Sequence, residues 1–274
     1  MFAAVHLLFS GFLALILPGC RSLPETYEAS RPTRHTVKTD AFTVFSDVDL
    51  PNDSPVIREL TLVGQQVQDE LQLPPQRDSI NIYLFPDEAA YRSYMHVTWS
   101  HLPPRRAYFV GSSRELAVYS FLGPSVQEDL RHEFTHGLLH SCLETVPLWL
   151  DEGLAEYFEV GGATVGLPHR SHLRELQEAA IEGWSPNLYR LELMHDFRDL
   201  TQRDYAESWV WVHFLLNGEP AVRQMFLTYI SQLQTARVPQ RLLNRVEEIV
   251  PSWQSELRKH IELLQSTQSD FALQ

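Results

Sequence analysis

The spacing of apolar residues changes along the chain, from the alternation typical of strands to the repeat of about 3.6 residues typical of helices. Two stretches have helical patterns, residues 54–73 and 86–99. Strand patterns occupy four stretches, residues 41–48, 79–85, 106–113 and 115–121. Because Gly-Ser-Ser-Arg separates the last two strands, we expect them to pair as a hairpin.

Helical patterns dominate the second half of the chain. Ser125 and Glu128 form a capping-box pattern that predicts the start of a helix there. The later helices are expected to break at Pro147, 161–162, 183–186 and 218–220. This order predicts an α+β fold, with a small mixed sheet packed on the first of these helices and a mainly helical half after it. We expect one domain over residues 41–274, with an α/β part over 41–124 and a helical part over 125–274.

The first 20 residues form an apolar run that ends in small residues and is short for a membrane span, which is typical of an export signal. The closing Leu17-Pro18-Gly19-Cys20 resembles the lipobox of bacterial lipoproteins, in which the Cys carries the lipid; Pro18 and the lack of Lys and Arg in the leader depart from that pattern. Polar residues 21–40 are expected to form a tether. The resemblance implies a bacterial cell-envelope protein held at a membrane by lipid on Cys20, whereas an ordinary cleaved signal would give a secreted soluble protein.

Charge and cysteine content limit the possible partners and crosslinks. Lys and Arg number 22 against 35 Asp and Glu, the net charge is −13, and no dense basic run occurs. Nucleic acid is therefore not an expected partner, because phosphate binding depends on clustered cations. Once Cys20 carries lipid, Cys142 has no partner for an intrachain disulfide, so stability must come from core packing.

A candidate metal site lies in residues 131–140, RHEFTHGLLH. On a helix, His132 and His136 differ by about 40° in direction and about 6 Å in rise, so their imidazoles can bind one ion. Glu133 is turned about 100° away from His132, which suits a carboxylate that contacts the attacking water instead of the metal. His140 lies about 12 Å along the axis from His132 and cannot share that ion, so a structural role is expected for it.

A second helix pattern, in residues 147–159, PLWLDEGLAEYFE, offers carboxylates for the third ligand that a catalytic metal site needs. Glu152, Glu156 and Glu159 lie within about 40° of one direction on this helix. The opposite face carries Leu150, Leu154 and Phe158. The acidic face can therefore turn either to solvent or to a cation.

The two strings together resemble a known group. His-Glu-Phe-Thr-His followed by Trp-Leu-Asp-Glu-Gly-Leu-Ala-Glu-Tyr is similar to the gluzincin zinc metallopeptidases, in particular the peptidase MA-like families, over residues 128–159. In the more distant M1 family of aminopeptidases, a Trp-Leu-x-Glu-Gly string carries the third zinc ligand. The resemblance implies a zincin-like fold and a Zn²⁺ cofactor held by His132, His136 and Glu152.

The spacing departs from that pattern and leaves an alternative open. Fifteen residues separate His136 from Glu152, fewer than in the M1 family, whereas nineteen separate His136 from Glu156, close to a thermolysin-like spacing. Glu152 is preferred because the residues around it match. Glu156 then resembles the acidic residue that hydrogen-bonds a ligand histidine from outside the metal shell. The alternative is that the two carboxylates exchange roles.

The resemblance also suggests how substrate is held. Tyr205 begins an apolar helix, as does a Tyr that stabilises the oxyanion in gluzincins, and His195 and His213 are weaker candidates for this task. In zincin folds an edge strand beside the zinc helix binds substrate in extended form, so residues 115–121 are expected to be that edge.

The expected function is zinc-dependent hydrolysis of a peptide or protein substrate, with Glu133 as the general base. Exopeptidase action is disfavoured because no Gly-rich amine-binding motif of the M1 type precedes the histidines. The alternative is a lipid-anchored protein of zincin-like fold that cleaves nothing and serves as a structural or binding module of the cell envelope.

Overall fold

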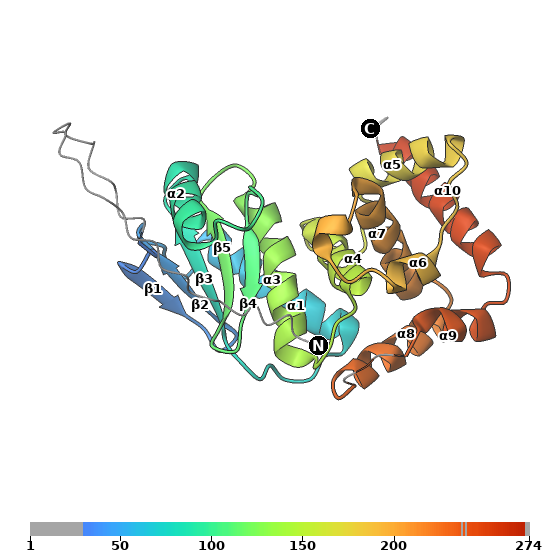
Figure 1. Ribbon diagram of the computed structural model, residues 1–274, viewed down its shortest axis with the longest axis horizontal. Coiled ribbons are helices and arrows are strands. Elements are labelled where there is room, and N and C mark those ends of the chain that lie inside the picture. Colours follow the sequence, from blue (N-terminus) through green and yellow to red (C-terminus); the bar gives the residue numbers. More distant parts are fainter. Residues whose placement is uncertain (1–29, 237, 239, 272–274) are drawn as a thin grey trace, which may run out of the picture.

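A small sheet with its helices forms one side of the molecule, and a group of helices forms the other (Figure 1). This computed structural model describes residues 30–271 except 237 and 239. The mixed α and β composition and the helical C-terminal half are confirmed. The expected signal peptide and Cys20 lie outside the described residues. Within the described part of the chain, no helix has both the length and the apolar character needed to span a membrane.

The sheet has five strands in the order β1-β2-β3-β5-β4. Strands β2, β3 and β5 run parallel, and β1 and β4 pair antiparallel at the two edges. The strand bounds are β1 His35–Lys38, β2 Phe42–Ser46, β3 Ile80–Phe85, β4 Tyr108–Gly111 and β5 Leu116–Phe121. The expected hairpin is confirmed as β4 and β5.

Two expectations about the sheet are wrong. Residues 115–121 are not an edge strand, because β5 pairs with β3 on one side and with β4 on the other; β4 is the edge on this side of the sheet. The tether expected over residues 21–40 is also too long, because β1 lies within it and pairs with β2. A polar strand of four residues, with only Val37 buried, gives too weak an alternation to be recognised in the sequence.

Side chains of β3 alternate between two cores, as the two-residue period of a strand requires. Ile80, Ile82 and Leu84 pack with helices α1 (Pro55–Leu71) and α3 (Val126–Cys142). Tyr83 and Phe85 pack on the opposite face with helix α2 (Glu88–Thr98). The α3 helix begins where expected, but Ser125 makes no side-chain cap; its hydroxyl instead accepts a hydrogen bond from Arg106.

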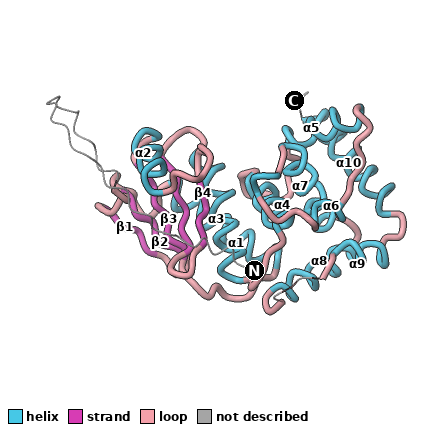
Figure 2. Tube along the Cα trace, in the orientation of Figure 1, coloured by secondary structure: helices cyan, strands magenta, loops and turns pink. Residues whose placement is uncertain are grey.

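The remaining helices form the helical side of the molecule, with α7 near its centre (Figures 1 and 2). Their bounds are α4 Leu148–Glu159, α5 Arg170–Ile181, α6 Leu188–Glu192, η1 Phe197–Asp199, α7 Gln202–Asn217, α8 Pro220–Leu233, α9 Leu242–Ile249 and α10 Trp253–Phe271. The four expected helix breaks are confirmed: three lie between consecutive helices, and the one at 218–220 is the junction of α7 with α8, whose first residue is Pro220.

Helix α4 packs very closely on α7, and Gly153 makes this approach possible. A Cβ atom at this position would lie 2.6 Å from the backbone oxygen of Ser208, well inside van der Waals contact. The absence of a side chain therefore allows the two backbones to meet. Because Glu152 precedes this glycine, the same contact fixes the carboxylate's position relative to the rest of the protein.

Helix α3 belongs in space to the sheet and not to the helical side, so the division expected at residue 125 is displaced. It covers the sheet beside α1, and the chain enters the helical side only at α4 (Figure 2). One continuous hydrophobic core nevertheless includes residues of α1, α3, α4 and α7. The two candidate ligand strings therefore lie on adjoining helices, one from each side.

A pair of histidines, of which His213 is buried and His260 partly buried, joins α7 to α10 and gives the fold an expected pH dependence. His213 Nε2 donates to the carbonyl of Gly166 at 3.0 Å, so its Nδ1 accepts from His260 Nε2 at 2.8 Å. Burial, and then the neighbouring His213, lower the pKa of His260 to about 4. The unfolded chain takes up this proton more readily, so acidification from pH 6.5 toward 4 should reduce the free energy of unfolding by at most about 3 kcal/mol.

Urea unfolding of the wild type and His260→Gln at pH 7 and pH 4.5 measures this effect. Gln retains an N–H donor for His213 but does not titrate, so the difference between the two proteins should shrink or reverse at the lower pH. A difference that is the same at both pH values would contradict the prediction.

Candidate metal centre

Three side chains from α3 and α4 bring ligand atoms together between the two sides of the molecule. Nε2 of His132 and Nε2 of His136 lie 3.2 Å apart, and Glu152 Oε2 lies 3.7 Å from each. A point equidistant from atoms so spaced lies about 2.1 Å from each, the length of nitrogen and oxygen bonds to a small divalent metal. These residues therefore could hold a metal ion.

The carboxylate of Glu152 supports this fit independently. The residue is only 6% exposed, and its Oε2 atom is buried without a hydrogen-bond partner. A buried carboxylate oxygen with no partner costs several kcal/mol unless a cation neutralises it. Of the two carboxylates that the sequence leaves open, Glu152 is the one whose oxygen faces both histidines.

Two further carboxylates hold the histidines from behind. Nδ1 of His132 lies 2.8 Å from Glu159 Oε2, and Nδ1 of His136 lies 2.8 Å from Asp151 Oδ1. Each Nδ1–H donates to its carboxylate, which directs the lone pair of Nε2 toward the other ligands. Asp151 also accepts from Nε2 of His140 at 2.9 Å, which gives that histidine a structural partner.

Glu156 does not take the position expected for it behind a ligand histidine. Its Oε2 lies 2.8 Å from His172 Nε2, on the next helix, and Glu159 and Asp151 hold the two ligands instead. The α4 helix packs with its acidic face across α3, so the carboxylate one turn further along reaches His132. That crossing geometry has no signature in the sequence.

These contacts change the protonation of the site. Burial by itself lowers the pKa of His136, but the carboxylate of Asp151 outweighs it and raises that pKa to about 9. The pKa of His132 is also raised, since Glu152 and Glu159 outweigh its burial. A metal ion must therefore displace protons here, and its affinity should increase with pH.

Removing the carboxylates behind the histidines should weaken metal binding. We expect Asp151→Asn and Glu159→Gln each to reduce affinity about 10- to 100-fold, because the imidazoles lose orientation and basicity. Competition of the protein with a chromophoric chelator for zinc measures this. Glu182→Gln, which removes an exposed carboxylate at the C-terminal end of α5, is the matched control. Unchanged affinity in both test variants would show that these contacts do not support a metal.

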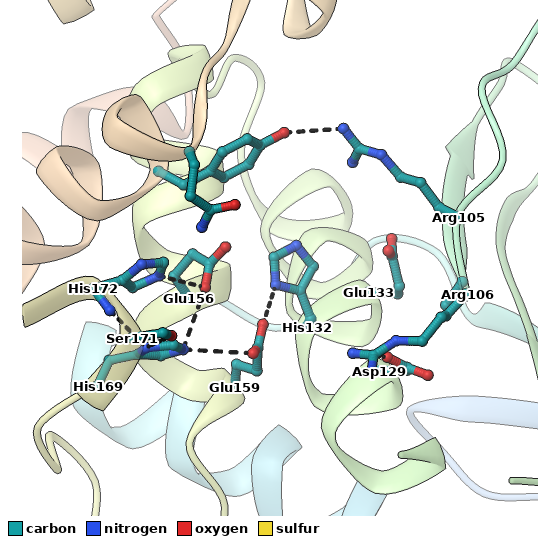
Figure 3. Close-up of a pocket in the computed structure, with 13 residues that line it drawn as sticks. Arg105, Arg106, Asp129, His132, Glu133, Glu156, Glu159, His169, Ser171 and His172 are labelled. Atoms are coloured by element: carbon teal, nitrogen blue, oxygen red, sulfur yellow. Dashed lines mark hydrogen bonds and ion pairs between the residues drawn. The ribbon is translucent and has the colours of Figure 1, made fainter. Parts of the chain in front are cut away.

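A cavity of about 450 Å³ opens beside His132 and exposes the other candidate catalytic residues (Figure 3). Glu133 lines it, with Oε2 accepting from the backbone N–H of Phe109 on β4 at 2.5 Å. This contact fixes the carboxylate and leaves Oε1 to accept a proton. The edge strand β4, which the sequence did not single out, thus lies directly beside the proposed base.

Tyr205 lines the same cavity, whereas the weaker candidates do not. Arg105 Nη2 donates to the Tyr205 hydroxyl oxygen at 3.0 Å, so the hydroxyl hydrogen is free to point elsewhere. Burial, and next the carboxylate of Glu152, raise the pKa of Tyr205, which keeps it a neutral donor. His195 is exposed, and His213 is buried against His260.

Two overlapping sets of His and Glu residues also bring ligand atoms together. The set of Glu156, His169 and His172 has a direct hydrogen bond from His172 to Glu156, and His172 Nδ1 is buried without a partner. The set of His132, Glu156 and Glu159 includes the hydrogen bond already described. Neither set combines two imidazoles that are each held by a carboxylate with a further carboxylate oxygen that lacks a hydrogen-bond partner. The set of His132, His136 and Glu152 has both features and is therefore the better metal centre.

Comparison with known proteins identifies no relative of this chain. No protein-family model matches the chain, and no curated protein matches it. The interpretation of the site therefore depends on its residues and their arrangement.

Proposed function

We propose that this protein is a zinc-dependent hydrolase of peptide bonds, of the gluzincin type and with a zincin-like fold. The observation that carries the proposal is the convergence of His132, His136 and Glu152 around one point, with Glu152 Oε2 otherwise partnerless. Two imidazoles and one carboxylate, with a cavity at their side, are the ligands typical of a catalytic zinc. Bound there, zinc would polarise water and the scissile carbonyl.

The chain's own residues supply the remaining chemistry. Glu133, held by the Phe109 N–H, takes a proton from the attacking water and returns it to the leaving amine. Tyr205 donates a hydrogen bond to the carbonyl oxygen as negative charge develops on it.

Edge strand β4 offers a place for extended substrate. Because the N–H of Phe109 points away from β5 toward Glu133, the polar backbone groups of alternate β4 residues face the cavity side. A peptide could therefore add to this edge beside the base.

We also propose export and lipid anchoring at the bacterial cell envelope. This part of the proposal rests on the apolar leader and on Leu17-Pro18-Gly19-Cys20. Mass spectrometry of the mature N-terminus tests it: a diacylated Cys20 supports the anchor, and an unmodified terminus contradicts it.

Metal content and hydrolysis, measured on the same preparations, test the enzymatic function. The wild type should retain one zinc per chain in elemental analysis and cleave members of a quenched-fluorescence peptide library. Glu133→Gln should retain the zinc and lose about 10²- to 10⁴-fold in rate. Glu128→Gln, on the same helix and at a residue that does not line the cavity, is the matched control and should cleave normally.

The outcomes separate the alternatives. Zinc binding with no cleavage of any peptide by the wild type would favour the envelope module that cleaves nothing. A wild type that does not retain zinc would remove the proposed mechanism altogether.

A further inference from the structure

A second charged group faces the cavity without a counter-ion. The guanidinium of Arg105 is partly buried and lines the cavity with His132 and Glu133 (Figure 3). Its hydrogen bond to the Tyr205 hydroxyl uses one of five N–H donors. Among the described residues, no carboxylate forms an ion pair with it.

Neighbouring charged residues of the cavity do have partners, in contrast to Arg105. Arg106 also lines the cavity, but it pairs with Glu128 and Asp129, each at 2.8 Å. The other cavity carboxylate close to this loop, Glu133, is held by a backbone N–H. In a chain with 35 acidic and 22 basic residues, carboxylates are in excess, yet among the described residues none forms an ion pair with Arg105, and Glu152 acts on it only through its charge, without contact.

Arg105 is held so that its free donors keep their direction. The rings of Tyr108 and Phe197 each lie 5.8 Å from its guanidinium carbon, one from the sheet side and one from the helical side. Tyr205 fixes a third direction from α7. A guanidinium positioned in this way loses little conformational entropy when it binds a planar anion.

We propose that Arg105 binds a carboxylate of the substrate, which makes peptides with a carboxylate near the scissile bond the preferred substrate class. A carboxylate can form two parallel hydrogen bonds with a guanidinium, and these charge-assisted bonds are stronger than those between neutral groups. The carboxylate comes either from the peptide's C-terminus or from an Asp or Glu side chain. This inference rests on the proposed function, since it names the substrate of the same cavity.

Equilibrium binding to the Glu133→Gln chain tests the inference without cleavage. Two pairs of fluorescent peptides are compared by anisotropy, with and without zinc: one pair ends in a free acid or an amide, and the other, blocked at both ends, carries an internal Glu or Gln. We expect at least one acidic peptide to bind about 10- to 100-fold more tightly than its neutral partner. The pair that shows the preference identifies the source of the carboxylate.

The same assay on two added variants shows whether Arg105 is responsible. Arg105→Gln, which retains a donor for Tyr205, should lose the preference; Arg106→Gln removes the same charge from the same loop and should retain it. Equal binding within both pairs, no binding, or a preference that survives in Arg105→Gln would overturn the inference. Failure of the proposed hydrolysis would look different: acidic peptides would bind with the expected preference, and the wild type would cleave none of them.

Discussion

Glu152→Gln is expected to bind zinc at least about 100-fold more weakly than the wild type. The substitution preserves the shape of the side chain but replaces an anionic ligand oxygen by a neutral one, so the site loses its only ligand charge. The loss should exceed that of the carboxylates behind the histidines, which act only through them. Zinc titration against a competing chelator gives the affinity directly.

Thermal unfolding provides a second measurement of the same substitution. Added zinc should raise the unfolding temperature of the wild type and should raise that of Glu152→Gln much less, since the variant gains little binding energy.

Glu156→Gln, one turn further along α4, is the comparison that decides between the two carboxylates. It should retain zinc and lose only the negative charge that Glu156 places beside His172 and His169. If Glu156→Gln loses the metal and Glu152→Gln retains it, the two residues have exchanged the roles assigned to them here.

Arg131→Met is expected to lower the free energy of unfolding by about 3 to 5 kcal/mol. Arg131 is 1% exposed and joins three helices: it bonds Glu59 at 2.7 Å and Gln66 at 2.8 Å on α1, and the carbonyl of Phe158 at 2.6 Å on α4. Removing the cation leaves a largely buried carboxylate and two polar groups without their partner. Urea unfolding at pH 7 measures the loss.

Two control proteins show whether this loss has the assigned cause. Arg203→Met removes two ion pairs at the protein surface, with Glu175, which is half-buried, and with the exposed Glu182, and should cost no more than about 1 kcal/mol. The double variant Arg131→Met with Glu59→Leu should recover part of the loss, because it removes the unpaired carboxylate. A single variant as stable as the wild type would show that Arg131 does not hold the helices together.

The helices, most of the strands and the candidate ligands could be predicted from the sequence because they depend on short-range periodicity. The four-residue spacing of His132 and His136 fixes both imidazoles on one face of a helix wherever that helix packs. The same period, with apolar residues opposite the acidic ones, placed Glu152 on the second helix, and Pro and Gly residues marked the helix ends. Apart from β1, which was not recognised, the strand and helix order likewise followed from the two-residue and 3.6-residue repeats.

Tertiary structure decided which distant groups meet, because side-chain contacts between elements depend on how those elements cross. Asp151 and Glu159 reach the histidines, and Glu156 reaches His172, only because α4 packs across α3 at one angle, set in part by the contact of Gly153 with α7. Strand order, which makes β4 and not β5 the edge, depends on hydrogen bonds between segments far apart in the chain. No sequence motif surrounds Arg105. The fold brings Glu128 and Asp129 to the neighbouring Arg106 and brings no carboxylate into contact with Arg105. Local periodicity thus determined the helices and the ligands they carry, and packing between elements determined the surroundings of those ligands.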